Sequence, residues 1–333
     1  MKTSISIAAV ALSTALAATS AFAADIQVSG KVFADYSTST ATGNPAKTGT
    51  TLSRTYLSVK KKIDDTWSVK LTLDSAYDAA TAKHNNVFLK KAQMTGKFSD
   101  EVNVKFGMIS TPWIGYEDKL GKHRHVSKSF ADTHKLGSSA DAGMGVFGSV
   151  LDGMLSYDVV SINGGGYGNT VITEKSDIEL RVGVQPIEGL TLDVGYRNGY
   201  KGAFVANTTE NKNTLTQIMV TYGAKIDGLS YRAGLNMISN DVKNELPTGT
   251  TVNEKGTEIW AWARKGEFGG FMRSESWDND STGAATEKRT VFGADYYPAK
   301  GLIVSLVFDS TTDVKGVAGD DKSKTGLFTQ FKF

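Results

Sequence analysis

Hydrophobic and polar residues alternate with a period of two along most of the chain from about residue 26 onward. Between Trp67 and Tyr77, nearly every second residue is apolar and most of the residues between them are polar. Because successive side chains of a β-strand point to opposite faces, this pattern predicts strands with one apolar and one polar face. Trp67 and Tyr77 share the apolar face, and a rise of roughly 3.3 Å per residue at a tilt of about 40° sets them about 25 Å apart along a membrane normal. That distance is typical of the apolar band of a membrane-spanning barrel.

About sixteen segments of this kind follow one another, with short turns alternating with longer loops. An even strand number with this alternation of connections is typical of single-chain transmembrane barrels. Lipid offers the backbone no hydrogen-bond partners, so a membrane-spanning sheet has to close on itself. The pattern therefore predicts an all-β fold, a transmembrane antiparallel β-barrel whose sixteen strands leave a water-filled channel. It also predicts that Leu71 faces lipid and Thr72 faces the lumen.

Two segments depart from the simple alternation. The faces of Phe88–Phe98 are less clean, because Lys90 falls in phase with apolar positions such as Met94. Trp260 and Trp262 fall on the polar face of their segment, so we expect two indole rings to point inward. No amphipathic helix is evident in the chain after residue 23.

The N-terminus has the features of a secretory signal peptide. Lys2 provides a positive charge, Ile5–Ala18 is a short apolar stretch, and Ala21-Phe22-Ala23 is a cleavage site of the A-x-A type. We expect residues 1–23 to be removed and residues 24–333 to form one barrel domain. Removal of Lys2 lowers the formal net charge from +2 to +1, so no strong overall field indicates a nucleic-acid partner. The chain has no cysteine and therefore no disulfide.

The segment Ile109–Ser139 interrupts the alternation for about thirty residues. Loops of this length are usually functional or disordered. This one is mainly basic and holds three of the four histidines. We expect it to fold into the lumen as the constriction of the channel. Its candidate pore residues are Glu117, Asp118, Lys119, Lys122, His123, Arg124, His125, Lys128, Asp132, His134 and Lys135.

The polar faces of the early strands are also basic. The residues assigned there to the pore wall are Arg54, Lys60, Lys70, Asp74, Lys91, Lys97 and Lys105. Because rings of basic side chains select anions, the pattern favours a channel for small hydrophilic solutes and inorganic ions with a preference for anions. The alternative is a weakly selective or unselective lumen, in which acids on later strands compensate these charges. Those acids are Asp141, Asp158, Glu179, Asp193, Asp295 and Asp309.

The histidines leave other functions open. The three in the long loop, with Asp132, could ligate zinc or copper, but the surrounding lysines and Arg124 oppose a bound cation, so we expect no metal and no cofactor. If they line the pore, they would instead add positive charge below about pH 6.5. All four histidines, including His84, fall in predicted loops, so an enzyme with a hydrolytic site at the rim is an alternative. A substrate-specific channel and a non-conducting binding or adhesion barrel are further alternatives.

With these features the chain resembles the Gram-negative porins. The resemblance covers the whole mature chain and rests on the signal cleavage site, the alternating hairpins and the C-terminal residues Leu327, Thr329, Phe331 and Phe333. It implies a sixteen-stranded outer-membrane channel for passive diffusion, commonly a homotrimer, with the loop after the fifth strand as the constriction. It also implies that Phe331 and Phe333 are read by the barrel-insertion machinery, and that the other partners are outer-membrane lipids rather than nucleic acid.

The charge of the loop departs from the general pattern of that family. Porins of the general-diffusion type often carry acids on the inward loop, opposite arginines on the wall. Here the loop itself is mainly basic. In this respect the chain is similar to the anion-preferring branch, so the resemblance does not imply a cation preference.

Overall fold

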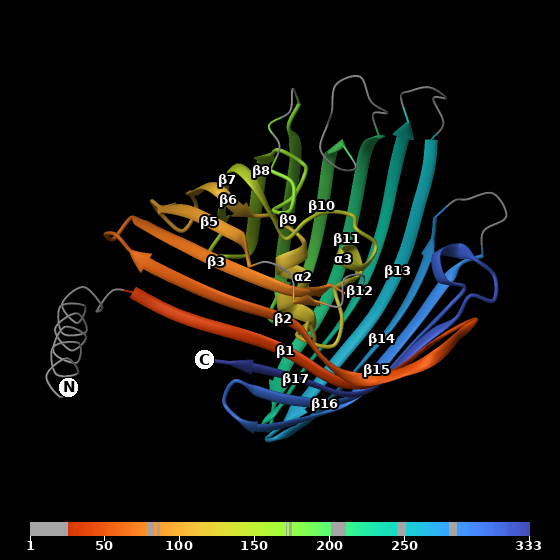
Figure 1. Ribbon diagram of the computed structural model, residues 1–333. Coiled ribbons are helices and arrows are strands. Elements are labelled where there is room, and N and C mark those ends of the chain that lie inside the picture. Colours follow the sequence, from red (N-terminus) through yellow and green to blue (C-terminus); the bar gives the residue numbers. More distant parts are fainter. Residues whose placement is uncertain are drawn as a thin grey trace, which may run out of the picture.

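The computed structural model describes residues 26–78, 83–84, 87–170, 172, 175–200, 211–244, 251–279 and 285–333. Within these residues one antiparallel sheet closes on itself, because β1 (Ile26–Ala41) pairs with both β2 (Asn44–Lys62) and β17 (Lys322–Lys332). Figure 1 shows the resulting barrel. The predicted fold class, an all-β antiparallel barrel of sixteen strands, is confirmed. The expected signal peptide, residues 1–23, lies outside the described residues.

Thirteen further strands complete the wall in chain order. They are β3 (Trp67–Asp78), β5 (Phe88–Lys97), β6 (Asn103–Ser110), β7 (Ala140–Val150), β8 (Leu155–Ile162), β9 (Asp177–Ile187), β10 (Leu190–Tyr200), β11 (Asn211–Ile226), β12 (Leu229–Asn244), β13 (Thr251–Lys265), β14 (Phe268–Asp278), β15 (Glu287–Ala299) and β16 (Leu302–Thr312). The two-residue strand β4 (Lys83–His84) pairs with the end of β3. Short turns gather at one rim. At Asp227 and Gly228, for example, φ is 49° and 78°, the two positive values that a tight hairpin turn of type I′ requires.

The two faces of the wall follow the predicted alternation. Leu71 is 42% exposed on the outside, whereas Thr72 is 6% exposed on the inside, so the predicted faces of β3 are confirmed. Other outward apolar side chains, such as Ile259 and Leu306, are more than half exposed. An apolar outer surface on a closed sheet is what the hydrocarbon of a bilayer requires. The side chain of Tyr77, which the sequence pattern places on the apolar face with Trp67, lies outside the described residues.

The irregular segment at the start of β5 is a β-bulge. The partner of Thr72 is Lys91, but the partner of Leu73 is Leu89, so Lys90 is an extra residue in β5. The bulge turns Lys90 inward, where it is 8% exposed, while Leu89 stays on the outer face at 42%. Lys90 therefore faces inward although the sequence alternation groups it with apolar residues such as Met94. The extra residue of the bulge reverses the faces of the side chains that precede it.

The connection between β6 and β7 contains two short helices, α2 (Ile114–Gly121) and α3 (Phe130–Thr133), and a 3-10 turn, η2 (Val314–Gly316), lies between β16 and β17. No amphipathic helix was evident from the sequence after residue 23, and these short helices were not predicted. Helices of four to eight residues are too short to give a clear 3.6-residue periodicity and depend on tertiary packing for their stability. None of the described helices is long and apolar enough to cross a membrane.

The barrel closes where the C-terminus meets the first strand. The backbone N–H of Gly30 donates to the carbonyl oxygen of Phe333 at 2.8 Å, and the N–H of Phe333 donates back to Gly30 at 3.2 Å. The aromatic ring of Phe333 lies directly over Gly30, at the place that a Cβ atom would occupy. Phe331 and Phe333 lie on the outer face, where they are 43% and 71% exposed.

Replacing Gly30 with valine is therefore expected to push the Phe333 ring off this seam. Forcing extra carbons into an occupied space typically costs about 1–3 kcal/mol. The urea midpoint of the folded barrel in vesicles measures the effect. The matched control is Gly49→Val on the neighbouring strand β2, because nothing lies within 4 Å of a Cβ at Gly49. Equal midpoints for the two variants would contradict the proposed role of Gly30.

Candidate functional site

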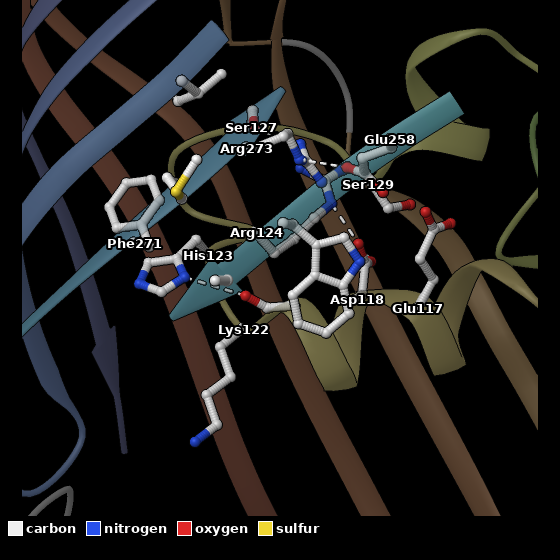
Figure 2. A pocket seen from close by; sticks show the side chains of 15 residues that line it. Glu117, Asp118, Lys122, His123, Arg124, Ser127, Ser129, Glu258, Phe271 and Arg273 are labelled. Atoms are coloured by element: carbon white, nitrogen blue, oxygen red, sulfur yellow. Dashed lines mark hydrogen bonds and ion pairs between the residues drawn. The ribbon is translucent and has the colours of Figure 1, made fainter. Parts of the chain in front are cut away.

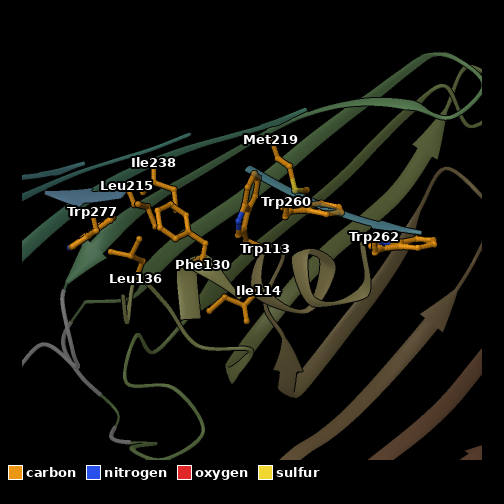
Figure 3. Packing of buried hydrophobic residues seen from close by; sticks show 11 residues of the cluster. Trp113, Ile114, Phe130, Leu136, Leu215, Met219, Ile238, Trp260, Trp262 and Trp277 are labelled. Atoms are coloured by element: carbon orange, nitrogen blue, oxygen red, sulfur yellow. The ribbon is translucent and has the colours of Figure 1, made fainter. Parts of the chain in front are cut away.

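The loop between β6 and β7 lies against the inner wall through a cluster of buried apolar side chains (Figure 3). The loop contributes Trp113, Ile114, Phe130, Ala131 and Leu136, and the wall contributes Leu215, Met219, Ile238, Trp260, Trp262 and Trp277. These wall residues belong to β11–β14 and point inward, where a water-filled lumen would otherwise favour polar side chains. Because the loop covers them, the burial of apolar surface holds it to one side of the barrel.

Trp260 and Trp262 point inward as predicted and are 5% and 9% exposed. The indole N–H of Trp262 donates to the carbonyl oxygen of Leu120 at 2.8 Å. The ammonium of Lys122 lies 3.4 Å from the centre of the same indole ring, within the range of a cation–π interaction. Trp262 therefore attaches the end of α2 to the wall.

The three loop histidines make separate contacts with the wall. His123 stacks on Phe271 with ring centres 3.9 Å apart, and its Nε2 lies 2.8 Å from Asp295 Oδ2. His134 stacks on Trp277 at 4.1 Å. His125 Nε2 lies 2.9 Å from Ser305 Oγ. Among the described residues, no three metal-ligating side chains gather at one place.

The contact of His125 brings together a serine, a histidine and an aspartate, the residue types of a hydrolytic triad. Ser305 Oγ donates its hydrogen bond to Asp295 at 2.6 Å, and the serine is 0% exposed. A nucleophilic serine needs a base that accepts its proton and a space in which a substrate carbonyl can reach it. The arrangement therefore serves as a buried hydrogen-bonded link between the loop and β15–β16.

Burial lowers the pKa of His125 and of His134 to about 3, with smaller contributions from the nearby charges of His123 and Arg289 respectively. In the unfolded chain both imidazoles protonate near about pH 6.5. The unfolded state therefore binds more protons between these values, and the free energy of unfolding falls as the pH drops from about 6.5 toward 3.

We accordingly expect the wild-type barrel to be less stable to urea at about pH 4.5 than at about pH 7.5. His134→Gln, which cannot be protonated, is expected to lose less stability than the wild type over the same interval. Other groups titrate in this range as well, so the comparison between the two proteins carries the prediction. A larger acid-induced loss in His134→Gln would contradict it.

Glu117, one of the two acidic residues of α2, is buried next to the barrel wall (Figure 2). Glu117 is 3% exposed, and its Oε1 accepts hydrogen bonds from the Phe130 N–H at 3.1 Å and from Asn236 Nδ2 at 2.9 Å. Asn236 also donates to Glu258. Burial, with the nearby Glu258 carboxylate, raises the pKa of Glu117 well above its usual value. Glu117 thus faces the wall and is held there by hydrogen bonds to the loop and to β12.

The other loop charges are partly balanced by one another. Arg124 lies 3.5 Å from Asp118 and 3.2 Å from Asp132, and Lys128 lies 3.4 Å from Asp132. Burial raises the pKa of Asp118. Lys119, Lys122 and Lys135 are exposed. Lys135 lines a separate cavity of about 170 Å³ between the loop and β7–β11.

The cations that the sequence analysis assigned to the pore wall divide into two groups. Two of the cations are neutralised, since Arg54 Nη2 lies 2.6 Å from Asp74 Oδ2 and Lys105 Nζ lies 2.6 Å from Asp158 Oδ1. The other four cations have no carboxylate within ion-pair distance among the described residues. They are Lys60, Lys70, Lys91 and Lys97. Of these, Lys60 and Lys97 are exposed near the short-turn ends of their strands.

A cavity of about 1110 Å³ lies in the lumen between the loop and the wall, and it extends to the short-turn rim at Pro298–Gly301. The charged side chains that line it are mostly basic. The cations are Lys31, Lys70, Lys90, Lys91, Lys119, Lys122, Arg124, Arg264, Lys300 and Lys332, and the acids are Asp118 and Glu267. Of the described residues that line this cavity, ten are therefore cationic and two are acidic. We refer to it as the basic chamber.

Sequence reasoning missed half of these cations. Lys31, Arg264, Lys300 and Lys332 stand on polar faces or in turns, but only the strand pairing brings both ends of the chain and β13–β16 to the same opening. Lys90 was not assigned to the lumen because the bulge interrupts the alternation of the strand. Asp193 and Asp309, two of the acids considered above as compensating charges, pair with wall arginines that the sequence analysis did not assign. Arg181 lies 2.7 Å from Asp193, and Arg289 lies 2.7 Å from Asp309. Cross-strand register, which the sequence does not reveal, decides such pairs.

No protein-family model and no curated protein matches the sequence. Several solved structures match in fold. The anion-selective porin from Comamonas acidovorans is similar with a TM-score of 0.69 at 11% sequence identity, over 92% of this chain and 99% of that chain. OmpF of Salmonella typhi, in complex with daunomycin, gives a TM-score of 0.62 at 14% identity, over 92% and 97%. OmpT, an outer membrane protein of Vibrio cholerae in a trimer form, gives 0.60 at 13%, over 92% and 99%.

At these identities the likeness concerns the fold. The matches extend over nearly the whole barrel, and each neighbour is a porin or an outer membrane protein. A closed sheet with an apolar outside and a charged inside agrees with them. The chain therefore has the fold of the sixteen-stranded porins, multi-pass proteins of the Gram-negative outer membrane.

Proposed function

We propose that this protein is a porin that lets small hydrophilic solutes and ions diffuse passively across the outer membrane, with a preference for anions. The single observation that carries the proposal is the basic chamber, which has ten cationic and two acidic lining residues among those described. The fold and the name of one structural neighbour, an anion-selective porin, agree with it. The finer possibility that the channel serves one particular substrate has no separate support.

The mechanism is exclusion by size where the loop narrows the lumen, combined with electrostatic selection beside it. Two unit charges about 8 Å apart interact by about 0.5 kcal/mol in bulk water and about 2 kcal/mol at an effective dielectric constant of 20. Several cations around one passage therefore raise the local concentration of anions and lower that of cations. Screening over about 8–10 Å weakens this at physiological salt, and passage requires that no single site holds the ion tightly.

The proposal includes the cellular setting. We propose that residues 1–23 are a cleaved signal peptide, that Phe331 and Phe333 are recognised by the barrel-insertion machinery, and that the mature barrel sits in outer-membrane lipid. We also propose a homotrimer, and the trimer form of the Vibrio cholerae protein supports this by analogy of fold. Chemical cross-linking of the purified protein in detergent is the direct measurement of the subunit number.

The experiment is solute influx into proteoliposomes, followed by their swelling. Solutes of similar size that are anionic, neutral or cationic are compared at low salt, where screening is weak. The wild type is expected to admit the anionic solute fastest. Lys119→Glu reverses a charge in the basic chamber and should slow the anion, whereas Lys288→Glu on the outer face of β15 is the matched control. No swelling with any solute would reject the channel, and equal rates for the three charges would reject the preference.

A further inference from the structure

The β-bulge in β5 places two consecutive lysines on the inner face of the barrel. Thr72 pairs with Lys91 and Leu73 with Leu89, which leaves Lys90 as the extra residue. In a regular strand, adjacent side chains point to opposite faces, so only one of these lysines would reach the lumen. Here both line the basic chamber. Bulges often occur next to functional sites, where they redirect a side chain.

The two ammonium groups are not cancelled by nearby acids. Lys90 Nζ lies 3.3 Å from Asp74 Oδ2, but Arg54 occupies the same carboxylate at 2.6 Å, so one acid faces two cations. Lys91 donates to Ser110 Oγ at 2.7 Å, and no carboxylate lies within ion-pair distance of it among the described residues. The local charge at this part of the wall therefore stays positive.

The lysines are also held in position before any ligand arrives. The Lys90 ammonium lies 4.8 Å from the centre of the Tyr56 ring and 4.9 Å from that of Tyr167. An ammonium has three N–H donors, so one hydrogen bond to Asp74 or to Ser110 leaves donors for a passing anion. Side chains that are already ordered lose less entropy on binding than free ones do.

The loop supplies cations to the same cavity. Lys119 and Arg124 line the basic chamber together with Lys90 and Lys91. An anion that moves through the chamber therefore passes between cations of α2 and its following turn and cations of the wall. The presence of Asp118 among them limits how tightly an anion is held, and release is as necessary for conduction as entry.

We propose that the bulge creates, at Lys90 and Lys91, a binding site for a small anion, and that this site sets the anion preference of the channel. The ligand is an inorganic anion or the carboxylate of an organic solute. The inference rests on the proposed function and assigns its selectivity to one irregularity of the sheet.

The test is the zero-current potential of single variants in a potassium chloride gradient and in a potassium acetate gradient. Lys90→Gln and Lys91→Gln each remove one charge, and we expect each to lower the anion-to-potassium permeability ratio about threefold, and the double variant about fivefold or more. Lys97→Gln is the matched control, because Lys97 stands on the same strand but does not line the basic chamber. A lower permeability ratio in both salts indicates a general anion-binding site, and a lower ratio in acetate alone indicates a site for carboxylates.

Deletion of Lys90 tests the bulge itself. Without this residue, Leu89 and Lys91 alternate as in a regular strand, so the barrel is expected to fold and to lose selectivity as Lys90→Gln does. The conductance of the wild type should also level off as the salt concentration rises, and that of the double variant should stay closer to linear, because a binding site saturates.

An anion-selective wild type whose ratio is unchanged by Lys90→Gln and Lys91→Gln would overturn the inference and leave the proposed function intact. A conducting wild type without anion preference would overturn both the proposed binding site and the selectivity part of the proposed function.

Discussion

Replacing Phe130 with alanine is expected to loosen the loop from the wall and to raise the single-channel conductance. Phe130 is 0% exposed and packs edge-on against His134 and Trp277, with ring centres 5.0 Å and 5.9 Å away. Removal of a buried phenylalanine side chain typically costs about 3–5 kcal/mol. The barrel strands keep their hydrogen-bonded ladders, so this cost falls mainly on the docking of the loop.

The measurement is the conductance distribution in planar bilayers, together with the largest neutral sugar that enters proteoliposomes. The matched control is Phe268→Ala, which removes the same atoms from a side chain that is 67% exposed outside the loop–wall cluster. An increase in conductance and in the sugar size limit for Phe130→Ala alone is the predicted result. A folded Phe130→Ala barrel with wild-type conductance and size limit would show that the loop does not limit the passage.

Replacing Leu71 with arginine is expected to destabilise the barrel by about 2–4 kcal/mol if the residue lies near the bilayer midplane. Leu71 is 42% exposed on the outer face, so its arginine would meet hydrocarbon. Thr72→Arg is the control on the neighbouring residue. Thr72 lines the basic chamber, so the longer side chain can extend into a water-accessible space. We expect its cost to be much smaller.

Urea unfolding of both variants in lipid vesicles gives the two free energies. The predicted result is a loss of stability for Leu71→Arg that exceeds the loss for Thr72→Arg. Similar stability for the two variants would contradict the assignment of the outer and inner faces of β3, and with it the membrane-spanning orientation of the strand.

The alternation of residues was enough to predict the fold class, because the period of two follows from strand geometry alone. Leu71 and Thr72 lie on the faces that the pattern assigns to them. The pattern failed at Lys90, since a bulge inserts one residue without any change in composition that would mark it. It also failed at α2 and α3, which are too short for a helical periodicity and form because the wall offers Trp260 and Trp277 as apolar partners.

The candidate site was less accessible to sequence reasoning than the fold. The basic character of the loop was visible, but the roles of its residues depend on what each one faces. Glu117, His125 and His134 contact the wall at Asn236, Ser305 and Trp277 respectively. Lys119 and Lys122 instead line the basic chamber. Lys105 was assigned by its face, yet its charge is balanced by Asp158, a pair that only the strand register brings together.

The anion preference is tested most directly by the zero-current potential of the wild-type channel in a planar bilayer. The bilayer separates two potassium chloride solutions that differ about tenfold in concentration and are dilute enough for weak screening. A channel lined by the basic chamber passes chloride more readily than potassium, so the dilute side is predicted to become negative. A dilute side that becomes positive would contradict the anion preference, and a folded barrel that carries no current would contradict the channel itself.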